Sequence, residues 1–155
     1  MNCFAAEAPI AGLSRASGEV KVSAPGNASR AVKTGEALPN GAAVRTGAEG
    51  EAEITLAGPS IARLGGKTTL TLAGQGRELE LGEGLVLFSV PRSAGAAKIK
   101  TGAINLDPRG STGLMERNGP AYVKILMLEG EARVYTSRLG ESIVVTAGQL
   151  LITGP

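Results

Sequence analysis

The chain is dominated by short runs in which apolar and polar residues alternate, with Gly, Pro and Asn between the runs. Val20 and Val22, for example, alternate with Glu19 and Lys21. The same period recurs along the 155 residues in segments 51–56, 69–72, 78–81, 132–134 and 142–146. A period of two is typical of a strand with one buried face. No window of eleven or more residues carries a helical apolar stripe without an interrupting Gly or Pro, so the sequence predicts an all-β protein.

The spacing of these runs indicates how the strands are arranged. About a dozen runs follow one another at intervals of about ten residues, which is typical of sandwiches, barrels and solenoids. Leu85–Val90 is apolar on both faces and is therefore expected to be a central strand. We predict many short strands in a rolled or β-solenoid-like arrangement of two sheets, with a closed β-sandwich as the alternative.

A weak internal repeat supports stacked strand-turn units. The dipeptide Gly-Glu occurs six times, beginning at residues 18, 35, 50, 82, 130 and 140. Three of these are evenly spaced, at 18, 50 and 82, and each precedes a run that reads as a strand. We expect a turn at each Gly, followed by a strand whose first exposed position is acidic.

Composition excludes several classes of function. The chain has no His and a single Cys, so it lacks the residues for a His-based catalytic triad, an internal disulfide or a zinc cluster. It has only four aromatic residues and a net charge of +2, which is unlike a nucleic-acid-binding surface. We predict a protein that is not an enzyme, with no catalytic residues, no cofactor, no metal and no nucleic-acid partner.

The N-terminal segment has a different residue pattern from the rest of the chain. Ala6-Glu7-Ala8 fits the small-x-small pattern of an export cleavage site, although the basic and apolar regions that precede such a site are missing. No run of 18 apolar residues occurs, so no transmembrane segment is predicted. We expect residues 1–13 to be a signal-peptide remnant or a disordered N-terminus, and residues 14–155 to be one domain.

Two glycine-rich segments resemble nucleotide-binding loops but lack the full motifs. Gly65-Gly66-Lys67-Thr68 has Ile61 where a phosphate-binding loop requires Gly. Gly74-Gln75-Gly76 has Leu79 where a dinucleotide fingerprint requires its third Gly. We interpret the first segment as a hairpin turn and the second as a turn.

Two kinds of binding site remain open. An exposed sheet edge could add a partner strand, and the first and last runs supply the candidate edge residues Val20, Val22 and Val144. Lys98 and Lys100 share one face of a strand, which would suit an anionic wall glycan or surface polysaccharide. A solvated strand face is the alternative interpretation of these two lysines.

The order of the motifs carries a family resemblance. The chain shows, in sequence, Gly18-Glu19-Val20-Lys21-Val22, Val44-Arg45-Thr46-Gly47, Leu79-Glu80-Leu81-Gly82, Lys98-Ile99-Lys100-Thr101, Leu126 to Val134 and Ala147-Gly148-Gln149. This order resembles the FecR-type domain of bacterial envelope proteins, over about residues 17–152. Two positions depart from the family pattern: Gly110–Met115 contains no aromatic residue, and Ala57 replaces an acidic residue.

The resemblance implies a location and a role. Such domains lie on the periplasmic or outer side of the envelope, and the regulatory members pass a signal from an outer-membrane receptor to an anti-sigma segment. We therefore expect an exported, periplasmic or extracellular module for sensing and signal transduction, whose partner is an envelope receptor or regulator protein. A module that binds wall glycan is the alternative.

Overall fold

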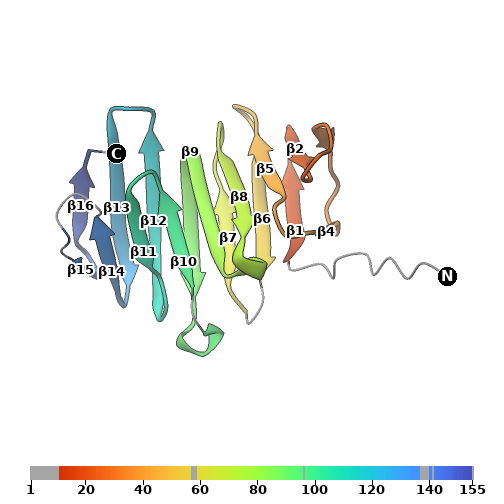
Figure 1. Cartoon of the computed structure of the whole chain (residues 1–155). Coiled ribbons are helices and arrows are strands. Elements are labelled where there is room, and N and C mark those ends of the chain that lie inside the picture. Colours follow the sequence, from red (N-terminus) through yellow and green to blue (C-terminus); the bar gives the residue numbers. More distant parts are fainter. Residues whose placement is uncertain (1–10, 57–58, 96, 137–139, 141, 155) are drawn as a thin grey trace.

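The computed structural model describes residues 11–56, 59–95, 97–136, 140 and 142–154. The described chain forms sixteen strands and two short 3-10 helices, η1 (Gly74–Gly76) and η2 (Arg92–Ala94). Figure 1 shows the strands running side by side along an elongated molecule, with the chain progressing from one end to the other. The prediction of an all-β fold with many short strands is confirmed.

The strands form two sheets, which we call sheet A and sheet B. Sheet A contains, in spatial order, β4 (Ala37–Leu38), β1 (Ala11–Ser17), β6 (Glu51–Leu56), β7 (Ile61–Leu64), part of β9 (Glu78–Val90), β12 (Ser111–Asn118), β13 (Tyr122–Glu129) and β16 (Leu150–Thr153). Sheet B contains β3 (Arg30–Ala31), β2 (Val20–Ser23), β5 (Ala43–Thr46), β8 (Thr69–Ala73), the rest of β9, β10 (Lys98–Thr101), β11 (Ile104–Asp107), β14 (Glu131–Thr136) and β15 (Ser142–Thr146). All pairings are antiparallel except the parallel pair of β9 and β10.

Strand β9 joins the two sheets. Its first half pairs with β8 in sheet B, and residues 84–90 pair with β12 in sheet A. Gly84 lies where the strand changes sheet and has φ +100°, a conformation that favours glycine. The buried hydroxyl of Thr68 stabilises this bend, because it accepts a hydrogen bond from the Leu85 N–H at 3.0 Å. The result is one large mixed sheet that rolls over but does not close.

The core lies between the two sheets and is almost entirely aliphatic. Alternate residues of each strand point inward, as the period of two predicts, and Phe88 is its one aromatic side chain among the described residues. Fully buried members come from both sheets, including Leu13, Ile54, Leu70, Leu81, Ile99, Leu106, Met115 and Ile125. Burying such side chains is the main favourable contribution to folding. The predicted central strand 85–90 does lie in the middle of sheet A, between β7 and β12.

The two ends of the molecule differ. At the end nearest the N-terminus, the outermost strands β3 and β4 are only two residues long. At the other end, the outermost strands β15 and β16 are longer and lie close together (Figure 1). Strand β1 begins at Ala11, so the domain boundary predicted at residue 14 falls inside this strand. Residues 1–10, where the signal-peptide remnant was expected, lie outside the described residues.

The Gly-Glu repeat corresponds only partly to turns. Gly18 and Gly130 have φ of +70° and +72°; Gly18 lies in the turn before β2 and Gly130 directly before β14, as expected. Gly50 precedes β6 in a turn, since its N–H donates to the Gly47 carbonyl. Gly82, in contrast, lies inside β9, so the third evenly spaced repeat does not open a strand.

Candidate functional site

Exposed apolar side chains gather at the end formed by β15 and β16. The described residues include six large hydrophobic side chains that are exposed, and all of them lie between residues 128 and 152: Leu128, Tyr135, Ile143, Val144, Leu150 and Ile152. Large exposed apolar residues that cluster in this way mark interaction surfaces more often than scattered ones do. This end of the molecule is therefore the first candidate for a functional site.

Strand β15 has a free edge. It pairs with β14 on one side, and no described strand pairs with its other side. The Ala147 N–H donates to the carbonyl of Gly130, the residue opposite it. Along an antiparallel strand, backbone groups point alternately toward the paired strand and away from it. The N–H and C=O of Val144, three residues before Ala147, therefore point away from β14. The Thr146 N–H on the same edge is already satisfied by the Gln149 side chain at 2.8 Å. Backbone groups of Ser142 and Val144 are thus available to another strand.

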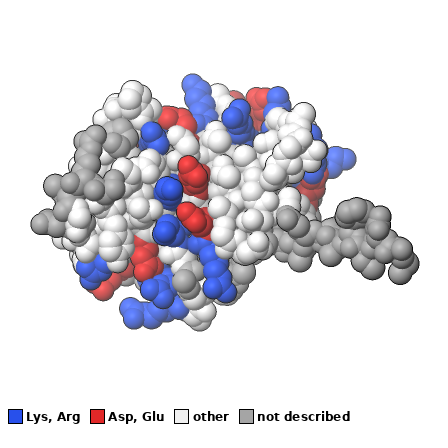
Figure 2. Space-filling model, in the orientation of Figure 1, with Lys and Arg blue, Asp and Glu red and all other residues white. Residues whose placement is uncertain are grey.

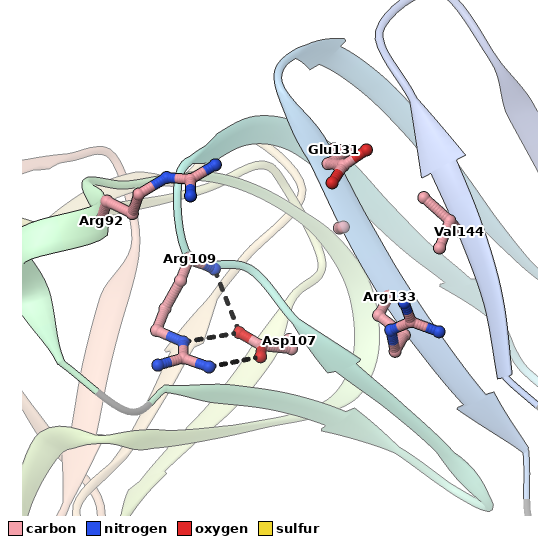
Figure 3. A pocket seen from close by; sticks show the side chains of 7 residues that line it. Arg92, Asp107, Arg109, Glu131, Arg133 and Val144 are labelled. Carbon is pink, nitrogen blue, oxygen red and sulfur yellow. Dashed lines mark hydrogen bonds and ion pairs between the residues drawn. The ribbon is translucent and has the colours of Figure 1, made fainter.

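A charged pocket lies directly beside this edge (Figure 3). Its volume is about 310 Å³, and its lining comes from η2, β11, the turn after β11, β14 and β15: Arg92, Asp107, Arg109, Glu131, Ala132, Arg133 and Val144. Three arginines and two acidic residues leave one net positive charge in the lining. Figure 3 shows Arg92 and Arg109 on one side, with Glu131, Arg133 and Val144 across from them.

Asp107 organises one wall of the pocket. Its carboxylate accepts hydrogen bonds from the Arg109 side chain at 3.0 and 3.2 Å and from the Arg109 backbone N–H at 3.2 Å. These bonds to Arg109 lower the pKa of Asp107 below its ordinary value of 3.8. Arg133 donates to the Ser142 hydroxyl at 2.9 Å and so connects β14 with the edge strand. The arrangement suits recognition of a carboxylate or a backbone carbonyl.

The structure separates the candidate edge residues that the sequence predicted. Val144 lies on the free edge and is 39% exposed. Val20 and Val22 are buried in the core, and β2 is covered on both sides by β3 and β5. The expectation that this first run forms an exposed edge is wrong, because β3 and the Val32 N–H occupy its outer side.

The two candidate lysines lie among acidic residues. Lys98 and Lys100 are placed opposite Glu78 and Glu80 in the parallel pair of β9 and β10. Figure 2 shows the same pattern more widely, with acidic and basic side chains next to one another over the middle of the molecule and uncharged areas on either side. The register thus places an acidic residue beside each of the two lysines.

Sequence reasoning missed the arginines of the pocket. Arg92 and Arg133 are distant in the sequence from Asp107 and Arg109. Arg133 meets Asp107 because β14 pairs with β11, which places the two residues directly opposite each other, and Arg92 on η2 lies beside the turn at Gly110. No local pattern in the sequence connects these residues, because their approach depends on strand pairing.

Within the described ranges, no group of three or more His, Cys, Asp or Glu side chains could hold a metal ion. The same part of the chain contains no helix long and apolar enough to cross a membrane.

Comparison with known proteins agrees with the fold. The model of the FecR protein family matches residues 42–133, which is more than half of the chain. The chain therefore belongs to the FecR family, and the family expectation from the motifs is confirmed. A comparison with curated proteins finds no significant match.

A solved structure has the same architecture. It is the crystal structure of a candidate anti-sigma factor from Parabacteroides distasonis ATCC 8503, with a TM-score of 0.61 and 14% sequence identity. The similarity covers 72% of this chain and 59% of the other, so this chain spans less than two thirds of that protein. At this identity the likeness shows a shared fold.

Proposed function

We propose that this chain is a non-catalytic sensory and protein-interaction module of the bacterial cell envelope, and that a partner protein adds a strand to β15. Membership of the FecR family supports a regulatory role, as does the shared fold with a candidate anti-sigma factor. The partner class that this family suggests is a receptor or regulator protein. An exported location, periplasmic or extracellular, belongs to the same proposal.

The free edge of β15 is the observation that carries the proposal. An added strand would hydrogen-bond to the outward N–H and C=O of Ser142 and Val144, which needs no special side chains on this chain. Ile143 and Val144, 44% and 39% exposed, would become covered. Strand addition therefore satisfies the polar edge and removes apolar surface from water in one step.

The pocket beside the edge could select among partner strands by the charge of their side chains. Alternate side chains of an added strand point to the same face as Val144, and that face leads to Arg133, Arg109 and Arg92. With one net positive charge in the lining, the pocket favours a partner strand that carries an acidic residue at this position.

A proline substitution at the edge tests the proposal. Val144→Pro removes an N–H that β14 does not use, so it blocks strand addition and leaves the β14–β15 ladder intact. Val144→Ala is the matched control, because it shortens the side chain and keeps the N–H. Envelope fractions would be passed over immobilised wild type and both variants, after circular dichroism has shown that all three are folded.

The expected result is a protein retained by the wild type and by Val144→Ala and lost with Val144→Pro. Equal retention by all three would show that β15 is not the binding edge. Retention of wall glycan and no protein would contradict the interaction-module proposal as a whole.

A further inference from the structure

The outer face of sheet A is largely apolar over β9, β12, β13 and β16, whereas over β6 and β7 it carries the ion pair of Glu53 and Arg63. Inward positions on β9, β12 and β13 are filled by core residues such as Phe88, Met115 and Ile125. The outward positions between them align across β9, β12, β13 and β16. The register places four leucines in one row: Leu87, Leu114, Leu126 and Leu150. The outer face of sheet B, in contrast, carries residues such as Glu80, Lys100 and Asn105 in the corresponding row.

Further apolar side chains widen this row into a patch. Leu85 and Ile152 lie one outward position along from Leu87 and Leu150, and Leu128 lies on the other side. Leu128, Leu150 and Ile152 are 47%, 53% and 57% exposed. We call Leu85, Leu87, Leu114, Leu126, Leu128, Leu150 and Ile152 the leucine face. A contiguous apolar patch of this kind on the outside of a sheet marks an interaction surface.

One ion pair lies within the leucine face. Glu116 and Lys124 are directly opposite each other on β12 and β13, one outward position along from Leu114 and Leu126. Their charged atoms, Lys124 Nζ and Glu116 Oε1, are 3.9 Å apart, and the two side chains are 41% and 34% exposed. Glu116 also accepts a hydrogen bond from the Tyr122 hydroxyl at 2.9 Å. The charges are therefore placed at the surface and are only loosely paired within the chain.

We propose that the leucine face binds the leucine face of a second copy of this chain, about a two-fold axis that runs parallel to the strands between β12 and β13. This axis places β12 of each copy over β13 of the other, at the same height along the strands. Leu114 then meets the partner's Leu126, and Leu87 meets the partner's Leu150. Two sheets stacked with their strands nearly aligned are a common packing of apolar sheet faces.

Charge complementarity favours this occupant. The same axis that matches the leucines places Glu116 over the partner's Lys124 and Lys124 over the partner's Glu116. The single ion pair within each leucine face is joined by two further contacts between the chains, and no like charges of this pair face each other. A two-fold interface must be self-complementary in this way, because each copy presents the same patch.

The size of the face predicts a weak dimer. Four strands at about 4.8 Å separation, each up to eight residues long, give a footprint of about 20 by 25 Å. That is below the ~800 Å² per partner of a standard stable interface. The dimer is therefore expected to dissociate reversibly in the micromolar range. This proposal is independent of strand addition at β15.

Charge reversal tests the contacts between the two chains, because mixing two oppositely changed variants can restore them. Sedimentation velocity over about 5–500 μM would be run on the full chain and on Glu116→Lys and Lys124→Glu. Each variant places like charges across the axis, so each is expected to dimerise at least about tenfold more weakly than the wild type. An equimolar mixture of the two variants restores opposite charges across the axis and is expected to form a heterodimer.

Control variants distinguish dimerisation through the leucine face from association through the rest of the surface. Leu126→Gln, at the centre of the face, is expected to abolish dimerisation, whereas Lys98→Glu on sheet B and Val144→Pro at the edge leave it unchanged. A wild-type chain that stays monomeric at 500 μM would overturn the proposal, even if the leucine face then bound a partner helix. Variants that dimerise normally, or a mixture that dimerises no better than its components, would overturn the proposed axis.

Discussion

Replacing Thr68 with valine should destabilise the protein at the point where β9 passes from one sheet to the other. Thr68 is 1% exposed, and its hydroxyl accepts from the Leu85 N–H at 3.0 Å and lies 3.1 Å from the Gly66 carbonyl. Valine has nearly the same shape but no hydroxyl, so the Leu85 N–H would be left without this partner. A half-buried donor without its partner costs about 1–3 kcal/mol.

The effect is measurable by thermal or urea unfolding at neutral pH. A loss of about 2 kcal/mol lowers the midpoint of a domain of this size by about 4–8 °C. Thr68→Ser keeps the hydroxyl and should retain more of the stability than Thr68→Val does. Thr55→Val, on the exposed face of β6, should change the free energy of unfolding by less than about 0.5 kcal/mol. If Thr68→Val were as stable as the wild type, the hydroxyl would not support the bend.

Two further substitutions test other parts of the structure. Gly130→Ala should cost about 1–3 kcal/mol in chemical unfolding, because Gly130 has φ +72° and an added Cβ would meet the Gly110 carbonyl; an unchanged midpoint would contradict this geometry. Asp107→Asn should lose about 0.5 kcal/mol at pH 7. Because Arg109 lowers the folded pKa of Asp107, its contribution is present above pH 3.8 and is lost as the pH falls through the lowered value. The stabilities of wild type and variant should therefore converge as the pH falls well below 3.8, and a constant gap would refute the assignment.

Most strand positions were predictable from the sequence because most strands have one buried face. The alternation of apolar and polar residues around Val20 and Val22, and again around Ile54, matches the alternation of buried and exposed side chains in the structure. Pairing was not predictable in the same way. Gly65–Thr68 was expected to be a hairpin turn, and this is wrong because β7 and β8, on either side of it, belong to different sheets. A local turn pattern does not distinguish a hairpin from a crossing between sheets.

The segment 110–115, which lacks the family's aromatic residue, packs beside an aromatic residue of the neighbouring strand β9. Gly113 lies opposite Phe88 in the pairing of β12 with β9. An added Cβ on Gly113 would lie 2.9 Å from the Phe88 ring, so the glycine leaves room for an aromatic side chain supplied by β9. The departure from the family pattern could be seen in the sequence, but the contact with Phe88 depends on a strand pairing that only the fold reveals.

The candidate site was predictable at one residue and not at its neighbours. Val144 was identified because the last run of the chain is a natural candidate for an outermost strand, and it does lie on a free edge. Val20 and Val22 have the same local pattern but are covered by β3, whose two residues carry no recognisable strand signal. Edges are a property of the whole sheet, so they cannot be predicted from one strand.

The central claim is that a partner protein pairs with the free edge of β15, and site-specific crosslinking in cells tests it most directly. A photoreactive amino acid would replace Val144 on the edge or, as the control, Lys21 on β2 at the other end of the molecule. The proposal predicts a discrete protein adduct in the envelope fraction from position 144 and none from position 21. No adduct from position 144, or the same adducts from both positions, would contradict it.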